Sequence, residues 1–108
     1  MNILLSTTNN IPNHKINKII GVICGEAVIS TNALQDRMSG LKATFGGKLE
    51  NYTKLIQKSR EEAEENLLEE AISYNADAVI GVRYATTSIM QGTAEIMVYG
   101  TAVKLEKI

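Results

Sequence analysis

The chain has 108 residues, of which 44% are hydrophobic, and its 11 Lys and Arg against 12 Asp and Glu leave a formal net charge of −1. This length predicts a single domain, 1–108, and the balanced charge argues against a nucleic-acid partner. No stretch reaches the roughly 20 apolar residues of a membrane span, and the apolar start Ile3–Leu5 is too short for a signal peptide. The single cysteine, Cys24, excludes an intrachain disulfide, which fits a cytoplasmic protein.

The first third of the chain predicts two strands. Ile3–Thr8 is a short apolar segment that ends in the turn-prone run Asn9–Asn13. Lys15–Ser30 is longer and rich in β-branched residues, and both of its alternating sets are apolar: Ile20, Val22, Cys24 and Val28 on one side, Ile19, Ile23, Ala27 and Ile29 on the other. A strand that is apolar on both sides is expected to be buried on both sides.

The middle of the chain predicts a loop followed by the principal helix. Residues 31–47 contain three glycines and one short helical pattern, Ala33–Met38. From Lys48 to about Tyr74 the helical period places an apolar stripe on one face, made of Leu49, Tyr52, Ile56, Ala63, Leu67 and Tyr74. We expect the helix to end at Asn75, a residue type that accepts the left-handed cap conformation.

Two further strands, Ala78 to about Ile89 and Thr93 to Leu105, are predicted to form a hairpin around Gly92. The fold class is therefore α+β, an antiparallel-type sheet with one long helix. One helix covers one face of a sheet, and the chain offers no further element for the other face. The sequence thus predicts an oligomer.

The long helix carries a second apolar contact. Leu68 and Ile72 lie one turn apart on the side turned away from the core stripe, which favours a contact with another copy over isolated surface residues. The helix is basic over Lys54–Arg60 and acidic over Glu61–Glu70. A neighbour packed head to tail would set its basic half against this acidic half, whereas the alternative is a solvated acidic face.

Several short motifs together resemble the YbjQ-like family of small bacterial proteins, whose label is heavy-metal-binding. The resemblance covers essentially the whole chain. It rests on six motifs: Thr7-Thr8, Ile20-Gly21-Val22 with Gly25-Glu26, Gly46-Gly47-Lys48 followed by Tyr52, Ser59-Arg60 before Ala63, Asn75–Gly81, and Gly100–Val103. The family usually has Arg where this chain has Lys48, and Ala where it has Ser59. The change to Lys48 keeps the charge but loses the flat fork of a guanidinium, which weakens bidentate binding of an anion. The resemblance implies a dodecin-like β-β-α-β-β subunit assembled into a homopentamer.

Candidate ligand sites are few. A zinc site needs three or four N, S or O ligands, whereas this chain has one Cys and one His, Cys24 and His14, which leaves metal binding to a site shared between subunits. Cys24 by itself is expected to be a small buried hydrophobe. Gly46, Gly47 and Lys48 at the helix start form a candidate anion site, with free N–H groups and a positive helix end. In the alternative interpretation the two glycines only turn the chain into the helix.

Catalysis has little support in the sequence. Glu26 and Glu95 are acidic residues inside apolar strands, where an oligomer cavity would raise their pKa values. The alternative, which we favour, is that each faces water at a strand edge. Arg60 and Arg83 could pair with these carboxylates in a structural role. We therefore predict a non-enzymatic, oligomeric binding or scaffold protein without a cofactor. The alternatives are a heavy-metal-binding protein, as the family label suggests, and an enzyme with an intersubunit carboxylate/arginine pocket.

Overall fold

Two parts of the chain carry the fold. The computed structural model describes residues 2–30 and 45–108, with the backbone alone for 45–51. They form β1 (Leu4–Leu5), β2 (His14–Ser30), α2 (Phe45–Ser73), β3 (Ala78–Met90) and β4 (Thr93–Lys107). The bounds of the helix and of the three long strands agree with the prediction to within three residues. The short helix predicted at Ala33–Met38 lies outside the described residues.

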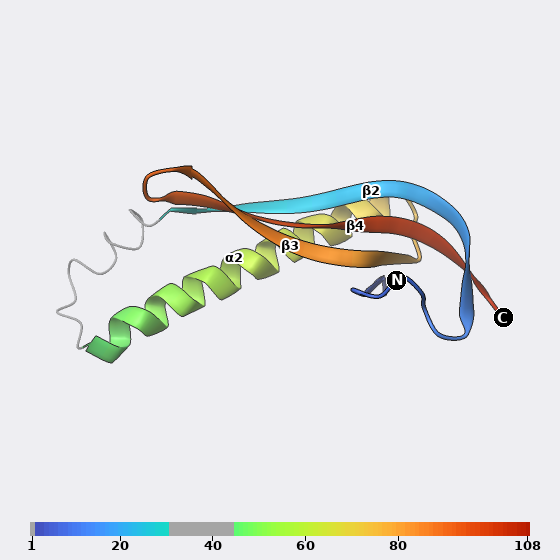
Figure 1. Ribbon diagram of the computed structural model, residues 1–108, viewed down its shortest axis with the longest axis horizontal. Coiled ribbons are helices and arrows are strands. Elements are labelled where there is room, and N and C mark those ends of the chain that lie inside the picture. Colours follow the sequence, from blue (N-terminus) through green and yellow to red (C-terminus); the bar gives the residue numbers. More distant parts are fainter. Residues whose placement is uncertain (1, 31–44) are drawn as a thin grey trace.

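The strands form one mixed sheet in the order β1-β3-β4-β2, and the helix passes over one face of it (Figure 1). β4 pairs antiparallel with both β2 and β3, so the predicted antiparallel-type α+β sheet is confirmed for the long strands. β1 is the exception, since Leu4 and Leu5 pair parallel with Ala78 and Val79 of β3. The first strand is shorter than predicted, although the N–H of Ser6 still donates to the carbonyl of Val79 at 2.9 Å.

The helix packs on β2 through a single row of buried side chains. Its buried positions repeat every four residues: Ser59, Ala63, Leu67 and Ala71. Gly25 of β2 lies beneath them, and a Cβ built on Gly25 would lie 2.1 Å from the carbonyl oxygen of Ala63. Ala63 and Leu67 confirm the predicted core stripe, whereas Ile56 and Tyr74 are 47% and 54% exposed and do not belong to it. The reason is that the first half of α2 diverges from the sheet (Figure 1) and Tyr74 follows the last helical residue.

The end of the helix is fixed as the sequence predicts. Asn75 has a positive φ of 57°. The N–H of Ala76 donates to the carbonyl of Ala71 at 3.0 Å, and the N–H of Asn75 donates to that of Ile72 at 2.9 Å. These two bonds are the pair that defines a Schellman cap, which satisfies the last helical carbonyls. The chain then turns directly into β3.

A bulge in β2 changes which side chains face the helix. The pairing of β2 with β4 shifts between Ile19 and Gly21. As a result Ile20 packs against the main core, while Ile19 is 66% exposed. The prediction that placed Ile20 with Val22, and Ile19 with Ile23, is therefore wrong for these two residues, because an extra residue in the ladder reverses the alternation.

The chain covers one end of the second sheet face by itself. Ile11, from the segment between β1 and β2, packs with Ala78, Ile80 and Val103 in a second core cluster. Their sequence neighbours Val79 and Ala102 belong to the main core under α2, so this cluster lies on the opposite face. The expectation that no element remains for that face is corrected here, since the N-terminal segment supplies one residue to it.

The chain is elongated. Its principal extents are 58 × 25 × 21 Å and its radius of gyration is 17.4 Å. A compact domain of this length has a radius of gyration of about 13 Å. The radius of gyration is larger here because the strands and the helix are long, and each packs against the rest of the chain over only part of its length.

Candidate functional site

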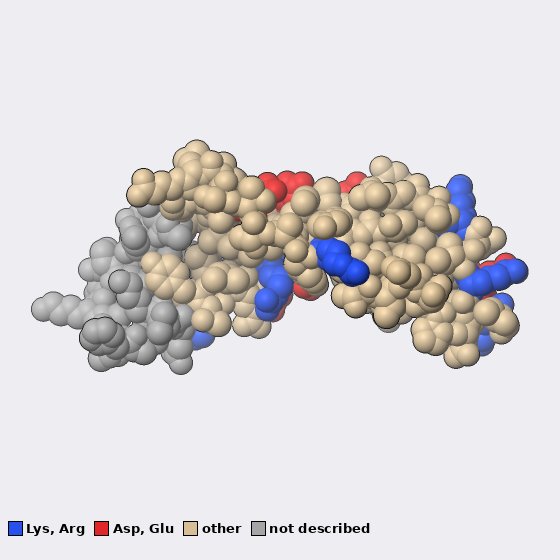
Figure 2. Space-filling view, in the orientation of Figure 1, with Lys and Arg blue, Asp and Glu red and all other residues tan. Residues whose placement is uncertain are grey.

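The sheet surface turned away from α2 is the first candidate site, and we call its central part the outer face. It consists of Val22, Cys24, Glu26 and Val28 of β2, and of Glu95, Met97, Tyr99 and Thr101 of β4. Val22 is 77% exposed and Val28 is 61% exposed. The prediction that β2 is buried on both sides therefore does not hold within one chain. Figure 2 shows mostly uncharged surface over the sheet, with several Lys and Arg near the C-terminal end, a few more near the middle, and Asp and Glu along one rim.

Two carboxylates meet on the outer face. Val28 lies opposite Glu95 and Glu26 lies opposite Met97, so the two glutamates are diagonal neighbours across β2 and β4. The pKa of Glu95 is raised, first by burial and then by the negative charge and the hydrogen bond of Glu26. A neighbouring negative charge disfavours the charged form of a carboxyl, which is the direction of the Glu95 shift. The sequence identified both residues, and the structure brings them together.

Cys24 lies beside this pair. Its thiol donates to Oε1 of Glu26 over 3.6 Å. Burial raises the pKa of the Cys24 thiol, and the hydrogen bond and charge of Glu26 raise it further. The side chain is half-buried rather than fully buried, which corrects the expectation of a core hydrophobe. Its neighbourhood is acidic, the opposite of the setting that activates a thiolate.

The second predicted metal ligand lies far from the first. His14 begins β2, ten residues before Cys24, which corresponds to about 33 Å along a strand. Its Nδ1 donates to the carbonyl of Pro12 at 2.8 Å. In the described part of the chain, no group of three His, Cys, Asp or Glu residues is placed to hold a metal ion. The fold of one chain therefore does not bring Cys24 and His14 to a common metal site.

The predicted anion site lies at the first turn of the long helix. The helix begins at Phe45, so Gly46 and Gly47 are its next two residues and Lys48 follows them. The side chain of Lys48 is outside the described part of the chain. Of the predicted oligomer contact, Ile72 is 60% exposed and Leu68 is half-buried.

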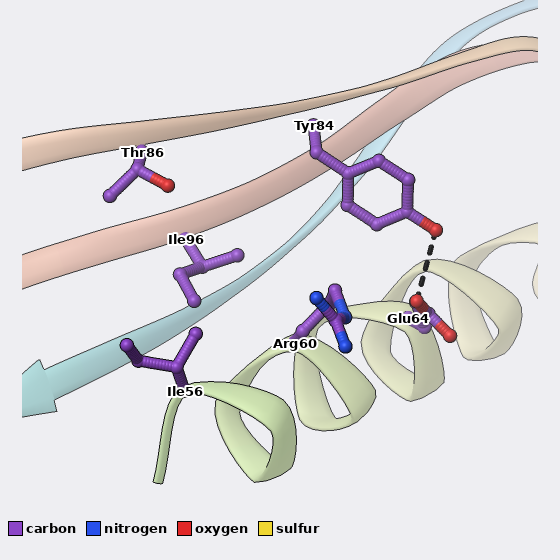
Figure 3. A pocket seen from close by; sticks show the side chains of 6 residues that line it. All are labelled: Ile56, Arg60, Glu64, Tyr84, Thr86 and Ile96. Carbon is purple, nitrogen blue, oxygen red and sulfur yellow. Dashed lines mark hydrogen bonds between the residues drawn. The ribbon is translucent and has the colours of Figure 1, made fainter. Parts of the chain in front are cut away.

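A groove between α2 and the β3–β4 hairpin is the second candidate site. It has a volume of about 480 Å³ and is lined by Ile56, Arg60, Glu64, Tyr84, Thr86 and Ile96 (Figure 3). The hydroxyl of Tyr84 donates to Oε1 of Glu64 at 2.9 Å. Burial raises the pKa of Tyr84, and the hydrogen bond and charge of Glu64 act in the same direction, while the charge of Arg60 opposes them. The sequence indicated only Arg60 as a candidate in this groove. The alternation of β3 turns Tyr84 and Thr86 towards the helix, and this pattern could have identified these two residues.

The arginines do not join the outer-face carboxylates. Arg60 lies in the groove, on the helix side of the sheet, whereas Glu26 and Glu95 lie on the outer face. Arg83 donates to the carbonyls of Thr7 and Val82 at 3.1 and 2.9 Å, and so ties the N-terminal segment to β3. The predicted carboxylate/arginine pocket is therefore not formed within one subunit.

Asp77 is a structural carboxylate that the sequence analysis did not identify. Its Oδ2 accepts from the N–H of Leu105 at 2.8 Å, and its Oδ1 accepts from Nζ of Lys104 at 3.3 Å. These bonds, above all the one from Leu105, lower the pKa of Asp77. The residue fastens the turn after α2 to β4, and we assign it no role in ligand binding.

Comparison with known proteins agrees with this fold. Residues 3–106 match the YbjQ family model, which is described as putative heavy-metal-binding. A UPF0145 protein of Thermus thermophilus is 49% identical over 106 residues, covering 98% of this chain and 93% of the relative. A UPF0145 protein of Thermotoga maritima is 42% identical over 105 residues, covering 97% and 99%.

A solved structure shares the architecture. It is a protein of unknown function of the DUF74 family from Pediococcus pentosaceus, with a TM-score of 0.57 at 14% identity, covering 96% of this chain and 98% of that one. Among the described residues, no helix is long and apolar enough to cross a membrane. The resemblance that the motifs indicate is thus confirmed over nearly the whole chain, which belongs to the YbjQ-like family of UPF0145 proteins.

Proposed function

We propose that this protein is a small, non-enzymatic homo-oligomer that acts as a binding or scaffold protein, and that neighbouring copies cover its outer face. The observation that carries the proposal is the exposure of large apolar side chains on the outer face of the edge strand β2, with Val22 at 77% and Val28 at 61%. Large apolar side chains gathered on one exposed sheet face are typical of a protein–protein contact.

The strand edges support self-association. β1 pairs with β3 only at Ala78 and Val79, so the described sheet offers no strand partner to the outer edge of β3 from Tyr84 to Met90. The opposite edge of the sheet is β2, where the side-chain amide of Asn66 covers the carbonyl of Glu26 at 2.8 Å. Long unpaired edges template pairing with another chain unless they are covered. Because the two edges lie on opposite sides of the subunit, a head-to-tail ring would use both.

The test is the mass of the native protein. A closed ring of five, the number that the family resemblance implies, would have a mass of about 59 kDa, five times the 11.8 kDa of one chain. Sedimentation velocity or light scattering would measure it, and a monodisperse 11.8 kDa species would refute the proposal.

A charge on the outer face makes the test specific. Val28→Glu is expected to dissociate the oligomer, because it would bury an unpaired carboxylate at the contact. Lys107→Glu, at the exposed C-terminal end of β4, is the control and should leave the mass unchanged. If both variants keep the wild-type mass, the outer face is not the contact.

Heavy-metal binding is the second candidate function. It is favoured by the description of the family model and by the thiol of Cys24, which lies beside Glu26 on the outer face. A ring would bring several copies of this thiol into one assembly, and thiolates bind soft metals. Elemental analysis after chelation and reloading would decide. Stoichiometric metal that is lost in Cys24→Ser would support this function, and no stoichiometric metal in the wild type would remove it.

A further inference from the structure

The groove between α2 and the β3–β4 hairpin is open to solvent and has the volume of a small-molecule site. Its volume of about 480 Å³ falls within the usual range for ligand pockets, about 300–1,000 Å³. Ile96, only 5% exposed, forms its floor, and Ile56, 47% exposed, flanks it from the helix. Figure 3 shows Arg60 between the apolar end, at Ile56 and Ile96, and the polar end, at Tyr84 and Glu64.

The charged groups of the groove are not equivalent. Oε1 of Glu64 accepts the hydroxyl hydrogen of Tyr84 at 2.9 Å, so this carboxylate already has a partner. Within the described part of the chain, Arg60 makes no ion pair or side-chain hydrogen bond. A guanidinium presents five N–H donors in a flat fork that fits a carboxylate. The unused binding capacity of the groove is therefore that of a cation beside an apolar surface.

We propose that this groove binds a small carboxylate-bearing molecule with an apolar body. Arg60 pairs with the carboxylate, and Ile56 and Ile96 contact the apolar part. The hydroxyl of Thr86, which also lines the groove, supplies a further polar contact. This inference gives a ligand class to the binding role proposed above, and it does not depend on the number of subunits.

Phenylacetate and its uncharged isostere phenylacetamide are the matched probes. Ligand-observed NMR titration of the native protein at constant ionic strength should give a dissociation constant for phenylacetate at least about fivefold lower than that for phenylacetamide. Fivefold corresponds to about 1 kcal/mol. Arg60→Gln should abolish the difference, because the neutral amide cannot form the charge-assisted pair.

Two further variants fix the interpretation. Glu64→Gln should tighten phenylacetate binding by about twofold, since it removes a negative charge while keeping an acceptor for Tyr84. Lys58→Gln removes a cation of the same helix that does not line the groove, and it should change nothing. Equal binding of the two probes to the wild type, or equal loss in Arg60→Gln and Lys58→Gln, would overturn the proposal.

Sedimentation of the same samples separates this inference from the oligomer. A monomer that still prefers phenylacetate would refute the ring and keep the ligand site. If Arg60→Gln instead dissociates the assembly, the groove is a contact between copies, and the ligand proposal is wrong. If Arg60→Gln folds poorly, two measurements still test the ligand proposal. These are the preference of the wild type for phenylacetate over phenylacetamide, and the tighter binding of phenylacetate by Glu64→Gln.

Discussion

Replacing Gly25 by alanine tests the closest approach between the helix and the sheet. The added methyl group would lie 2.1 Å from the carbonyl oxygen of Ala63 and 2.4 Å from the amide nitrogen of Leu67. Both atoms belong to the backbone of α2, so no rotation of a side chain relieves the contact. The helix as a whole has to move away from β2.

The size of the effect follows from that displacement. Ordinary contact begins at 3.4 Å, so the helix has to retreat by about 1.3 Å (3.4 − 2.1). A gap of this size forfeits at least about a quarter to a half of the dispersion attraction across it. It would open above Ala63 and Leu67, both fully buried. Overpacking a core usually costs about 1–3 kcal/mol, and we expect the upper end, about 3 kcal/mol, for a clash with backbone alone.

Urea unfolding at one fixed protein concentration would measure this loss. With a slope of about 1–3 kcal/mol per M, the midpoint should fall by about 1–3 M. Gly100→Ala is the comparison, because its new methyl group meets Cγ1 of Val79 at 2.8 Å as well as the carbonyl of Ile80 at 2.9 Å. Adding Val79→Ala should recover part of the Gly100→Ala loss. A Gly25→Ala shift below about 0.3 M with an unchanged slope would refute so close a packing of the helix on β2.

Four further outcomes are expected. Phosphate should raise the melting temperature of the wild type more than that of Lys48→Ala, since it would bind at the first helical turn; equal stabilisation would indicate general salting-out. Leu68→Glu should dissociate the oligomer or make it insoluble, as seen by light scattering, and an unchanged, equally stable assembly would make Leu68 an ordinary surface residue. Labelling of Cys24 by a thiol reagent at about pH 8 should be slow in the native protein and fast once it is denatured. Labelling of native Glu26→Gln should be faster than that of the native wild type, because Glu26 raises the pKa of the thiol. An unchanged rate in Glu26→Gln would exclude Glu26 as a cause of the slow labelling. Glu95→Gln should raise the free energy of unfolding at about pH 7 but not at about pH 3. The raised pKa of Glu95 means that the folded state disfavours its charged form, and this form prevails only at a pH above that pKa. An equal gain at both pH values would show a non-electrostatic effect.

The long elements could be predicted because their signals are local. The apolar period of the helix and the Asn75 cap lie within a few residues of each other, and the helix ends where they indicate. The outward alternation of β2 fails at Ile19 and Ile20, because the bulge depends on pairing with β4, more than 80 residues away along the chain. No pattern in the 17 residues of β2 reveals that shift.

The candidate site was predictable only in part for the same reason. Glu26 and Glu95 are each conspicuous in the sequence, but their proximity depends on the register of β2 against β4. The groove depends on how α2 lies over the sheet, and the helix approaches β2 most closely at Gly25 and Ala63. Such a geometry is a property of two elements together, which explains why Tyr84 and Thr86 were not expected to share a site with Arg60.

The position of β2 in the sheet also bears on how the chain folds during synthesis. Its strand partner in the described sheet is β4, and their paired residues are 63 (Ser30 and Thr93) to 93 (His14 and Lys107) positions apart. At about 5–20 residues per second, β2 leaves the ribosome about 3–19 s before its partner. The helix and the β3–β4 hairpin involve shorter separations and form sooner. A long β-branched strand without a partner is prone to aggregate, and charged residues that flank an apolar run oppose this. Lys15 and Lys18, which precede the apolar run of β2, are placed to have this effect.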